Sequence, residues 1–366
     1  MTPLETHLRR RIAIEGPLTL ADFMGDALGH PELGYYITRD PFGRAGDFTT
    51  APEISQMFGE LIGLWCAEVW AQMGSPGKVH LVEFGPGRGT LMADLLRAAK
   101  RMPGFLDAVR LHLVETSPIL RQTQARALER APMAPAWHSD IATLPDDAPL
   151  LIVANEFFDA LPIRQVQKTR EGWRERLVAV DPSKDELALM IAPGPGPIAG
   201  LIDPALAART KVGRVVELAP LAWRIAGDMG ARLSAQGGAA LAIDYGYEGP
   251  ATGDTLQAVK AHKPCPIFET PGEADLTAHV DFTALGRAAS AGGCRVSPVV
   301  TQGDFLRALG IEVRTQSLVK AAPGATGRQI AMARDRLIGA DGMGTLFKVL
   351  GLAANDLPPL PGLDPA

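Results

Sequence analysis

The sequence predicts an α/β protein whose main sheet is parallel and doubly wound, a Rossmann-like arrangement. Three observations predict this fold. Short apolar runs alternate with segments of helical periodicity between residues 78 and 155. The runs are apolar along their whole length, as expected for strands covered on both faces. The first run ends in a glycine-rich turn that leads directly into a helical segment, as in a βα unit.

The first 75 residues predict a helical layer with one long loop. Residues 2–16, 19–29 and 53–74 have apolar side chains at helical spacing, and each segment ends at a glycine. Residues 34–52 are rich in turn-forming and aromatic residues, so they predict a loop. Long ordered loops often carry function, and we expect this one to do so.

Residues 76–248 contain the predicted core, in which strands and helices alternate. The expected elements are strand 79–84, helix 91–102, strand 109–115, helix 118–131, strand 150–155, short antiparallel strands near 163–192, a helix flanked by turns within 215–238, and strand 239–246.

The last third of the chain predicts an insertion followed by the completion of the core. Residues 249–300 are punctuated by proline and glycine and form the insertion, with a helix from about residue 282 and a strand at 295–300. Residues 301–356 complete the core. The proline-rich end, 357–366, predicts a frayed tail.

Composition and charge exclude several classes of protein. The formal net charge is −5, whereas nucleic-acid-binding domains usually carry a basic face. The three cysteines form no CxxC pair and the seven histidines show no ligand spacing, so we expect neither a disulfide framework nor a metal site. The N-terminal segment lacks an apolar run of signal-peptide length, and no later segment predicts a membrane span. We therefore expect a cytoplasmic protein.

The strongest local signal is the turn after the first core strand, which contains Gly85, Pro86, Gly87 and Gly89. Such a turn allows backbone N–H groups and a helix start to approach a ligand closely. The dinucleotide fingerprint requires glycine at the sixth position, where this chain has Thr90, which disfavours a nicotinamide dehydrogenase. Glu83 followed by Gly-x-Gly-x-Gly instead resembles the first motif of S-adenosylmethionine-dependent methyltransferases. A tight turn without a ligand is the alternative.

Acidic residues at the next strand ends suit the rest of such a ligand. Glu115 ends the strand that follows the glycine turn, where a carboxylate can accept both hydroxyls of a ribose. Asp140 comes at the next expected strand end and suits the amino group of an adenine, with Ile141 as an apolar contact to the ring. A solvated charge or a helix cap is the alternative for Glu115, and a helix N-cap is the alternative for Asp140.

The strand at 150–155 ends in Asn155, and Glu156 and Asp159 follow around two phenylalanines. These polar groups are expected to face the same crevice as the glycine turn. The two rings, at 157 and 158, would shield the carboxylates from water, which an ordinary acidic first turn of a helix does not require. Two carboxylates suit a guanidinium, which is planar and is bound bidentately. We expect Glu156 and Asp159 to be the catalytic residues.

The chain resembles the family of mitochondrial complex I assembly-factor methyltransferases and their bacterial relatives, which are protein arginine methyltransferases of the class I fold. The resemblance covers almost the whole chain. It lies in the segments GYYITRDPFGRAGDFTTAPEISQMFGELIG (34–63), LVEFGPGRGTLMADLLR (81–97), HLVETSP (112–118), NEFFDALP (155–162), QKTREGWRER (167–176), GGAALAIDYG (237–246) and PGEADLTAHVDF (271–282).

The resemblance implies further site residues. The loop before residue 53 is expected to cover the cofactor, which makes Asp47, Thr49 and Thr50 candidate contacts, with helix capping as the alternative. Thr116 and Ser117, in the motif that contains Glu115, are expected to contact the cofactor as well. The implied cofactor is S-adenosyl-L-methionine, and the insertion is expected on the substrate side.

The implied partner is a protein that carries the acceptor arginine, such as a respiratory complex I subunit, and no nucleic acid or membrane is involved. Two other functions stay open. One is methyl transfer to a small molecule, and the other is an assembly chaperone with a structural cofactor pocket. The intact glycine turn, Glu115 and the acidic residues after strand 150–155 count against the chaperone.

Overall fold

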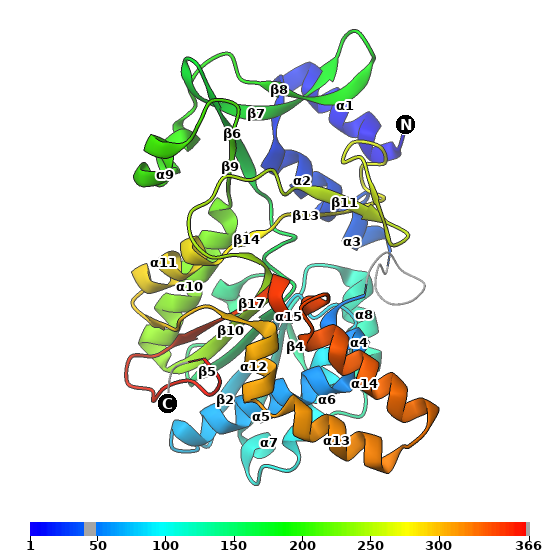
Figure 1. Ribbon diagram of the computed structural model, residues 1–366, viewed down its shortest axis with the longest axis vertical. Coiled ribbons are helices and arrows are strands. Elements are labelled where there is room, and N and C mark those ends of the chain that lie inside the picture. Colours follow the sequence, from blue (N-terminus) through cyan, green and yellow to red (C-terminus); the bar gives the residue numbers. More distant parts are fainter. Residues whose placement is uncertain (40–48, 364–366) are drawn as a thin grey trace. The chain divides into compact units, whose positions relative to one another are not determined.

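A computed structural model describes residues 1–39 and 49–363, which form two compact units that are each discontinuous in sequence (Figure 1). The segments of unit 1 are 1–39, Asp159–Trp223 and Gly249–His279, and those of unit 2 are Thr49–Phe158, Arg224–Glu248 and 280–363. The predicted segments 1–75 and 249–300 are therefore each divided between the units.

Unit 1 combines the N-terminal helices with two small sheets. Its elements are α1 (Pro3–Glu15), β1 (Leu18–Thr19), α2 (Leu20–Gly29), α3 (Tyr35–Thr38), β6 (Arg164–Thr169), β7 (Gly172–Asp181), β8 (Glu186–Ile191), the 3-10 helix η2 (Pro197–Leu201), α9 (Pro204–Arg209), β9 (Val215–Leu218), β11 (Gln257–Lys260), β12 (Lys263–Cys265) and β13 (Asp275–Thr277). One sheet has the order β1-β7-β6-β9 with β8 paired to β7, and the other has the order β12-β11-β13. The pairs β6–β7 and β7–β8 confirm the predicted antiparallel strands near 163–192.

Unit 2 contains the main sheet and most of the long helices. Its elements are α4 (Ala51–Ile54), α5 (Gln56–Gln72), β2 (Val79–Phe84), α6 (Thr90–Ala99), α7 (Phe105–Ala108), β3 (Val109–Val114), α8 (Pro118–Ala127), β4 (Ala136–His138), the 3-10 helix η1 (Ile141–Thr143), β5 (Leu150–Asn155), α10 (Pro220–Gln236, from Arg224 on), β10 (Gly238–Tyr247), β14 (Val280–Asp281), α11 (Phe282–Ala291), β15 (Arg295–Val296), β16 (Val300–Thr301), α12 (Gln302–Ala308), α13 (Ile311–Ala321), α14 (Ala325–Ile338), α15 (Met343–Leu346) and β17 (Phe347–Ala353).

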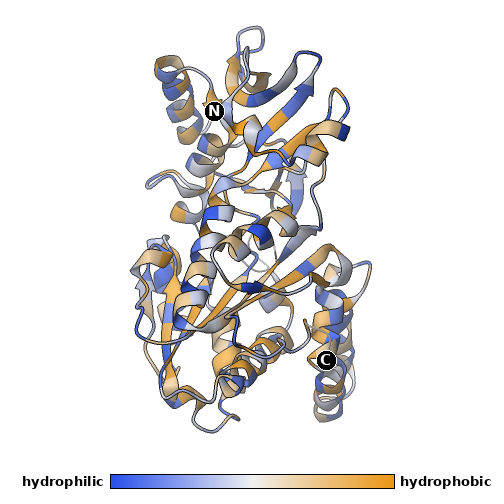
Figure 2. Ribbon diagram, turned by 90° about the vertical axis from the view of Figure 1, so that its left-hand side faces the viewer, coloured by the Kyte–Doolittle hydropathy of each residue, from blue (hydrophilic) through white to orange (hydrophobic). Residues whose placement is uncertain are grey.

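The main sheet has the order β15-β17-β10-β5-β2-β3-β4. The strands from β10 to β4 are parallel to their neighbours, and β17 runs antiparallel to β10. This confirms the predicted α/β fold with a doubly wound sheet. Strands β2 and β5 are buried along their whole length, and the central strands are mainly apolar (Figure 2). Since β2 has β3 on one side and β5 on the other, the strand order reverses at β2.

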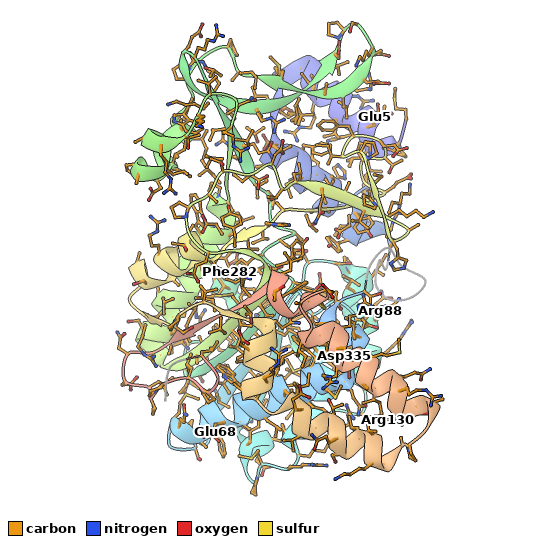
Figure 3. All side chains as sticks on the ribbon, in the orientation of Figure 1. Glu5, Glu68, Arg88, Arg130, Phe282 and Asp335 are labelled. Atoms are coloured by element: carbon orange, nitrogen blue, oxygen red, sulfur yellow. The ribbon has the colours of Figure 1, made fainter. Side chains whose placement is uncertain are left out.

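Helix α5 packs unusually close to α6, which follows the glycine turn. A Cβ added to Gly59 would lie 2.9 Å from the Leu91 carbonyl oxygen, and one added to Gly63 would lie 2.6 Å from that of Leu95. Only glycine fits at these two positions, one helical turn apart. The opposite side of α5 carries the exposed Glu68, which is labelled in Figure 3. The pair of glycines therefore fixes the helix that begins at the site described below.

Three local predictions are wrong. The helix expected at 53–74 is interrupted at Ser55, whose side chain accepts a hydrogen bond from Met57 N–H (3.2 Å) and caps α5. Residues 215–218 form strand β9 because they pair with β6, a long-range contact that local periodicity does not reveal. The strand expected at 295–300 consists of two short strands, β15 and β16, which both pair with β17.

The proline-rich end is packed up to Leu363, so the predicted frayed tail is wrong for this part of the chain. Leu360 and Leu363 are 1% and 4% exposed and join the main core of unit 2. The Trp65 indole N–H donates a hydrogen bond to the Pro361 carbonyl oxygen (3.1 Å). Apolar leucines between the prolines explain the packing.

None of the helices in the described ranges is both long enough and apolar enough to cross a bilayer.

Candidate functional site

The carboxyl ends of the central strands of unit 2 lie at one edge of the sheet. The register pairs Phe84 of β2 with Val114 of β3 and with Ala154 of β5. Ligands of doubly wound sheets bind beyond this edge, near the point where the strand order reverses. The glycine turn after β2, Glu115 after β3 and Asn155 at the end of β5 are therefore brought together, as predicted.

The glycine turn has the backbone that its sequence predicts. The φ angles of Gly85, Gly87 and Gly89 are +58°, +53° and +83°, in the left-handed region that favours glycine. The Gly89 N–H donates to the Pro86 carbonyl oxygen (2.8 Å), and α6 then begins without a side-chain cap. Arg88, labelled in Figure 3, lies within this turn. The uncapped start of α6 is suited to polar groups of a ligand.

Phe157, the first of the two phenylalanines after β5, lies against this turn. A Cβ added to Gly85 would be 3.0 Å from Cδ2 of Phe157. The Phe157 ring has edge contacts with Phe84 and Phe158, at centroid distances of 5.4 and 5.2 Å. The Phe158 N–H donates to the fully buried carboxylate of Asp244 (3.0 Å). These contacts tie the segment after β5 to the glycine turn.

Glu115 presents a buried, firmly held carboxylate at the end of β3. It is 8% exposed, and Oε1 accepts a hydrogen bond from the Ser117 N–H (2.8 Å). Oε2 accepts one from Nε2 of Gln124 (3.1 Å). Burial raises the pKa of this carboxyl group, and the hydrogen bonds from Ser117 and Gln124 oppose that effect. Such an acceptor is suited to the hydroxyls of a ribose.

Thr116 and Ser117 differ in their surroundings. Thr116 is exposed, whereas Ser117 is fully buried. The Ser117 Oγ caps α8 by accepting a hydrogen bond from the Leu120 N–H (3.3 Å). The described contacts of Ser117 thus support Glu115 and α8, and direct contact of either residue with the cofactor stays a prediction.

Asp140 has the helix-capping role that was the alternative for it. Strand β4 ends at His138, and the Asp140 carboxylate accepts a hydrogen bond from the Ala142 N–H (2.8 Å) at the start of η1. Ile141 is 4% exposed. A cap of this kind uses one carboxylate oxygen, so the adenine contacts of Asp140 and Ile141 stay predictions.

Two buried oxygens near the glycine turn have no hydrogen-bond partner among the described residues. One is Oδ1 of Asn155, at the end of β5, and the other is Oε2 of Glu83, in β2. Their residues are 8% and 3% exposed. Burial raises the pKa of Glu83 well above its usual range. Buried polar groups without partners are costly, so the presence of two of them here fits a ligand that supplies hydrogen bonds.

Glu156 directly follows β5 with an unusual backbone. Its φ is +50°, a strained value for a residue with a side chain, and its N–H donates to the Ile243 carbonyl oxygen (2.8 Å). Oε1 accepts hydrogen bonds from the Ala51 N–H (2.9 Å) and from Nδ2 of Asn155 (3.3 Å). Thr50, which precedes Ala51 in the chain, is 8% exposed. The structure thus places the segment after the long loop beside Glu156.

Asp159 and Thr49 each lie at the start of a segment of one of the two units. Asp159 is the first residue of its segment of unit 1, is 6% exposed, and accepts a hydrogen bond at its carbonyl oxygen from the Ala278 N–H (3.0 Å). Burial raises the pKa of the half-buried Tyr36 most, and the charges of Asp275 and then Asp159 add to that rise. Asp47 lies outside the described residues. Thr49 is half-buried at the start of unit 2.

Sequence reasoning missed two supporting residues, Gln124 and Asp244. Both are fully buried. Gln124 donates a hydrogen bond to Glu115, and Asp244 accepts one from the Phe158 N–H. A signal existed for Gln124, because it lies on the apolar face of α8 between Leu120 and Leu128, where a polar residue is unexpected. Asp244 similarly ends a run of buried apolar residues in β10.

Comparison with known proteins supports S-adenosylmethionine as the ligand, the cofactor that the sequence implies. A family profile whose description reads "Putative S-adenosyl-L-methionine-dependent methyltransferase" matches residues 61–300, more than half of the chain. The chain is 37% identical to the protein named "Protein arginine methyltransferase NDUFAF7, mitochondrial" of Xenopus tropicalis, over 98% of this chain and 89% of that protein. It is 36% identical to the human protein of the same name, over 96% of this chain and 83% of that protein.

A solved structure has the same fold along nearly the whole chain. It is a likely methyltransferase from Burkholderia thailandensis bound to S-adenosylhomocysteine, with a TM-score of 0.85 and 27% identity, covering 98% of this chain and 94% of that one. A second structure from the same organism, without that ligand in its description, gives a TM-score of 0.82 and 28% identity over 98% and 93% of the two chains. The present chain therefore belongs to this family of methyltransferases, whose cofactor is S-adenosyl-L-methionine.

Proposed function

We propose that the protein transfers a methyl group from S-adenosylmethionine to the guanidinium of an arginine in a protein substrate. The observation that carries the proposal is Glu156, a carboxylate held directly after β5 next to the segment that packs on the glycine turn. Its left-handed φ of +50° is an observed strain, and such strain gathers at functional sites.

The cofactor side is proposed to consist of residues from three strand ends. Glu115 would accept hydrogen bonds from the ribose hydroxyls, and Asn155 Oδ1 would accept one from a polar group of the ligand. The glycine turn, with Gly85 and Gly87, would allow close approach of the ligand to the backbone. When bound, S-adenosylmethionine supplies a methyl group on a positively charged sulfur.

The acceptor side is proposed to hold a guanidinium by its charge. A guanidinium has a pKa above about 12 and keeps its proton, so the protein must position one nitrogen and stabilise positive charge. The Glu156 carboxylate is fixed by the Ala51 N–H and is suited to this task. Asp159, three residues further along the chain, is included as the second carboxylate on the basis of sequence.

The names of the relatives support the proposed class of substrate. Proteins that share 36–38% identity with nearly the whole chain are named protein arginine methyltransferases, which supports a protein acceptor. A respiratory complex I subunit is the proposed substrate, and the cytoplasm is the proposed location, although the curated relatives are named as mitochondrial.

Transfer of labelled methyl groups tests the proposal. The protein is incubated with labelled S-adenosylmethionine and host extract, and we expect the label in arginine residues of a polypeptide. Glu156→Gln removes the charge but keeps the oxygen that accepts from Ala51. Asp159→Asn removes the charge of the second carboxylate and keeps the size of the side chain. We expect transfer to be lost in both, with S-adenosylhomocysteine affinity and melting temperature kept. Glu68→Gln, an exposed change on α5, is the matched control.

Each other outcome has its own meaning. Near-normal transfer by both variants would remove Glu156 and Asp159 from the acceptor site. Label that enters only small molecules would contradict a protein substrate. Cofactor binding without any transfer would favour the assembly chaperone.

A further inference from the structure

Gln124 is a polar residue in a fully buried position. It is 0% exposed on α8, on the same helix face as the buried Leu120 and Leu128. A buried amide is unfavourable unless its oxygen and its N–H groups find partners. Where these groups are directed therefore shows what the residue does.

Each polar atom of Gln124 has a partner from a different element. Its Oε1 accepts a hydrogen bond from the Trp137 indole N–H (2.9 Å) on β4. Its Nε2 donates to the Gly87 carbonyl oxygen (2.8 Å) in the glycine turn and to Oε2 of Glu115 (3.1 Å). An indole can only donate, so it holds the amide oxygen towards Trp137 and directs both N–H groups to the other two partners.

We propose that Gln124, oriented by Trp137, is a positioning residue that sets the Glu115 carboxylate and the glycine turn in the geometry that binds the cofactor. The inference rests on the proposed contact of Glu115 with the ribose. Ser117 N–H holds Oε1 of Glu115 and Gln124 holds Oε2, so the carboxylate cannot rotate freely. A group fixed in advance loses less conformational entropy when the ligand binds.

The same contact controls the charge of Glu115. Burial raises its pKa, whereas the N–H groups of Ser117, Gln124 and Thr116 and the nearby charge of Arg121 lower it. Arg121 itself donates to the Glu115 carbonyl oxygen (2.8 Å). Loss of the Gln124 donor therefore raises the pKa of Glu115, and the ionised form that accepts from the ribose is then lost at a higher pH.

The test is S-adenosylhomocysteine affinity measured by calorimetry across pH. Affinity should fall on the acidic side of the profile, here called the acidic limb, where Glu115 becomes protonated. In Gln124→Leu we expect this fall to occur at a pH about one unit higher than in the wild type. At a fixed pH on the limb, that shift corresponds to about tenfold weaker binding. Trp137→Phe frees the amide to turn over and should move the limb in the same direction by less. This milder variant keeps the test informative if Gln124→Leu folds poorly.

Gln302→Leu is the matched control. Gln302 is also 0% exposed in unit 2, and its Nε2 donates to the Leu337 carbonyl oxygen (2.9 Å). We expect lower stability in this variant but an unmoved acidic limb. Unchanged affinity at every pH in a folded Gln124→Leu, with no shift of the limb, would show that Gln124 only packs and would overturn the inference.

A double variant separates this inference from the proposed function. If Glu115 binds the ribose, Glu115→Gln weakens binding and abolishes the acidic limb, and adding Gln124→Leu should then have little further effect. Additive losses of affinity would overturn the inference about Gln124 and leave the proposed function untouched. Unchanged affinity and an unchanged limb in Glu115→Gln would contradict the ribose contact on which this inference rests, whereas methyl transfer to arginine is tested separately through Glu156.

Discussion

Two polar clusters within unit 2 differ in how their hydrogen-bonding groups are satisfied. The first is a ladder of three histidines on β2, β3 and β4. His80 Nδ1 lies 2.9 Å from His112 Nε2, and His112 Nδ1 lies 2.9 Å from His138 Nε2. The ends of the ladder contact Asp147 (2.9 Å) and Thr143 (3.0 Å). Every ring nitrogen of the ladder therefore has a partner.

The second cluster lies at the carboxyl ends of β2 and β5, where two buried oxygens lack, within the described part of the chain, the partners that the ladder has. Asn155 Oδ1 and Glu83 Oε2 are buried without a partner among the described residues, and Glu156 has a strained backbone. Polar groups that satisfy each other contribute to the fold and need no ligand, whereas unsatisfied ones are destabilising until a ligand arrives. The ladder is therefore structural, and the unsatisfied groups at the edge support the proposed binding site.

The largest expected effect is at the edge. Gly87→Val places a branched side chain at a φ of +53°, where the backbone must approach the ligand. We expect S-adenosylmethionine binding to be lost while the fold survives, at a stability cost of about 1–3 kcal/mol from backbone strain. Calorimetry and circular dichroism on one preparation measure both. Unchanged affinity in a folded variant would refute the location of the cofactor site.

Next in size is a pair of substitutions with contrasting effects on the ligand-free protein. His112→Phe leaves one ring nitrogen of His80 and one of His138 without a partner, and we expect a loss of about 1–3 kcal/mol in the free energy of unfolding. Asn155→Leu removes an unsatisfied acceptor, so stability should stay close to that of the wild type while cofactor affinity falls by about 1 kcal/mol. Denaturant unfolding without ligand compares the two. A comparable loss of stability in both would erase the distinction between ladder and edge.

The pH dependence of stability should also have opposite signs in the two clusters. Burial lowers the pKa of His112 from 6.5 to about 4, next to His80, His138 and Lys78. Between these values the unfolded chain binds a proton that the folded chain does not, so stability falls as the pH drops from 6.5 to 4. The total is on the order of 1–3 kcal/mol.

For Glu83 the folded pKa is raised well above its ordinary value of 4.5. The folded protein then keeps a proton that the unfolded chain loses, so this group lowers stability as the pH rises above 4.5. Unfolding of His112→Phe and Glu83→Gln across pH checks both signs: the first should flatten the acidic side of the curve and the second the neutral side. A neutral slope unchanged by Glu83→Gln would show that Glu83 is ionised in the fold.

The sequence predicts the parts that depend on local pattern. Strands 79–84 and 150–155 have the predicted bounds, because a buried strand needs an unbroken apolar run, and the glycine turn joins β2 to α6 as predicted. What it does not predict depends on distant partners. Strand β9 exists through β6, and the end of the chain is packed through the Trp65 contact with Pro361. The φ of Glu156 likewise depends on its neighbours in space.

The smallest expected effect concerns Asp140, which caps a helix beside the ladder and is also a predicted contact of the cofactor. Its carboxylate accepts from the Ala142 N–H and its carbonyl oxygen accepts from the Thr143 hydroxyl (2.7 Å), whose oxygen also contacts the ladder. As a cap alone, Asp140→Ala should cost about 0.5–1 kcal/mol of stability and change no ligand preference. As an adenine contact, it should also remove discrimination against an S-adenosylhomocysteine analogue that lacks the 6-amino group. Affinities for both ligands, measured for the wild type and Asp140→Ala, decide between the roles. We expect the discrimination to fall, because the cap uses only one carboxylate oxygen. Equal discrimination in both proteins would assign Asp140 to the fold, together with the histidine ladder.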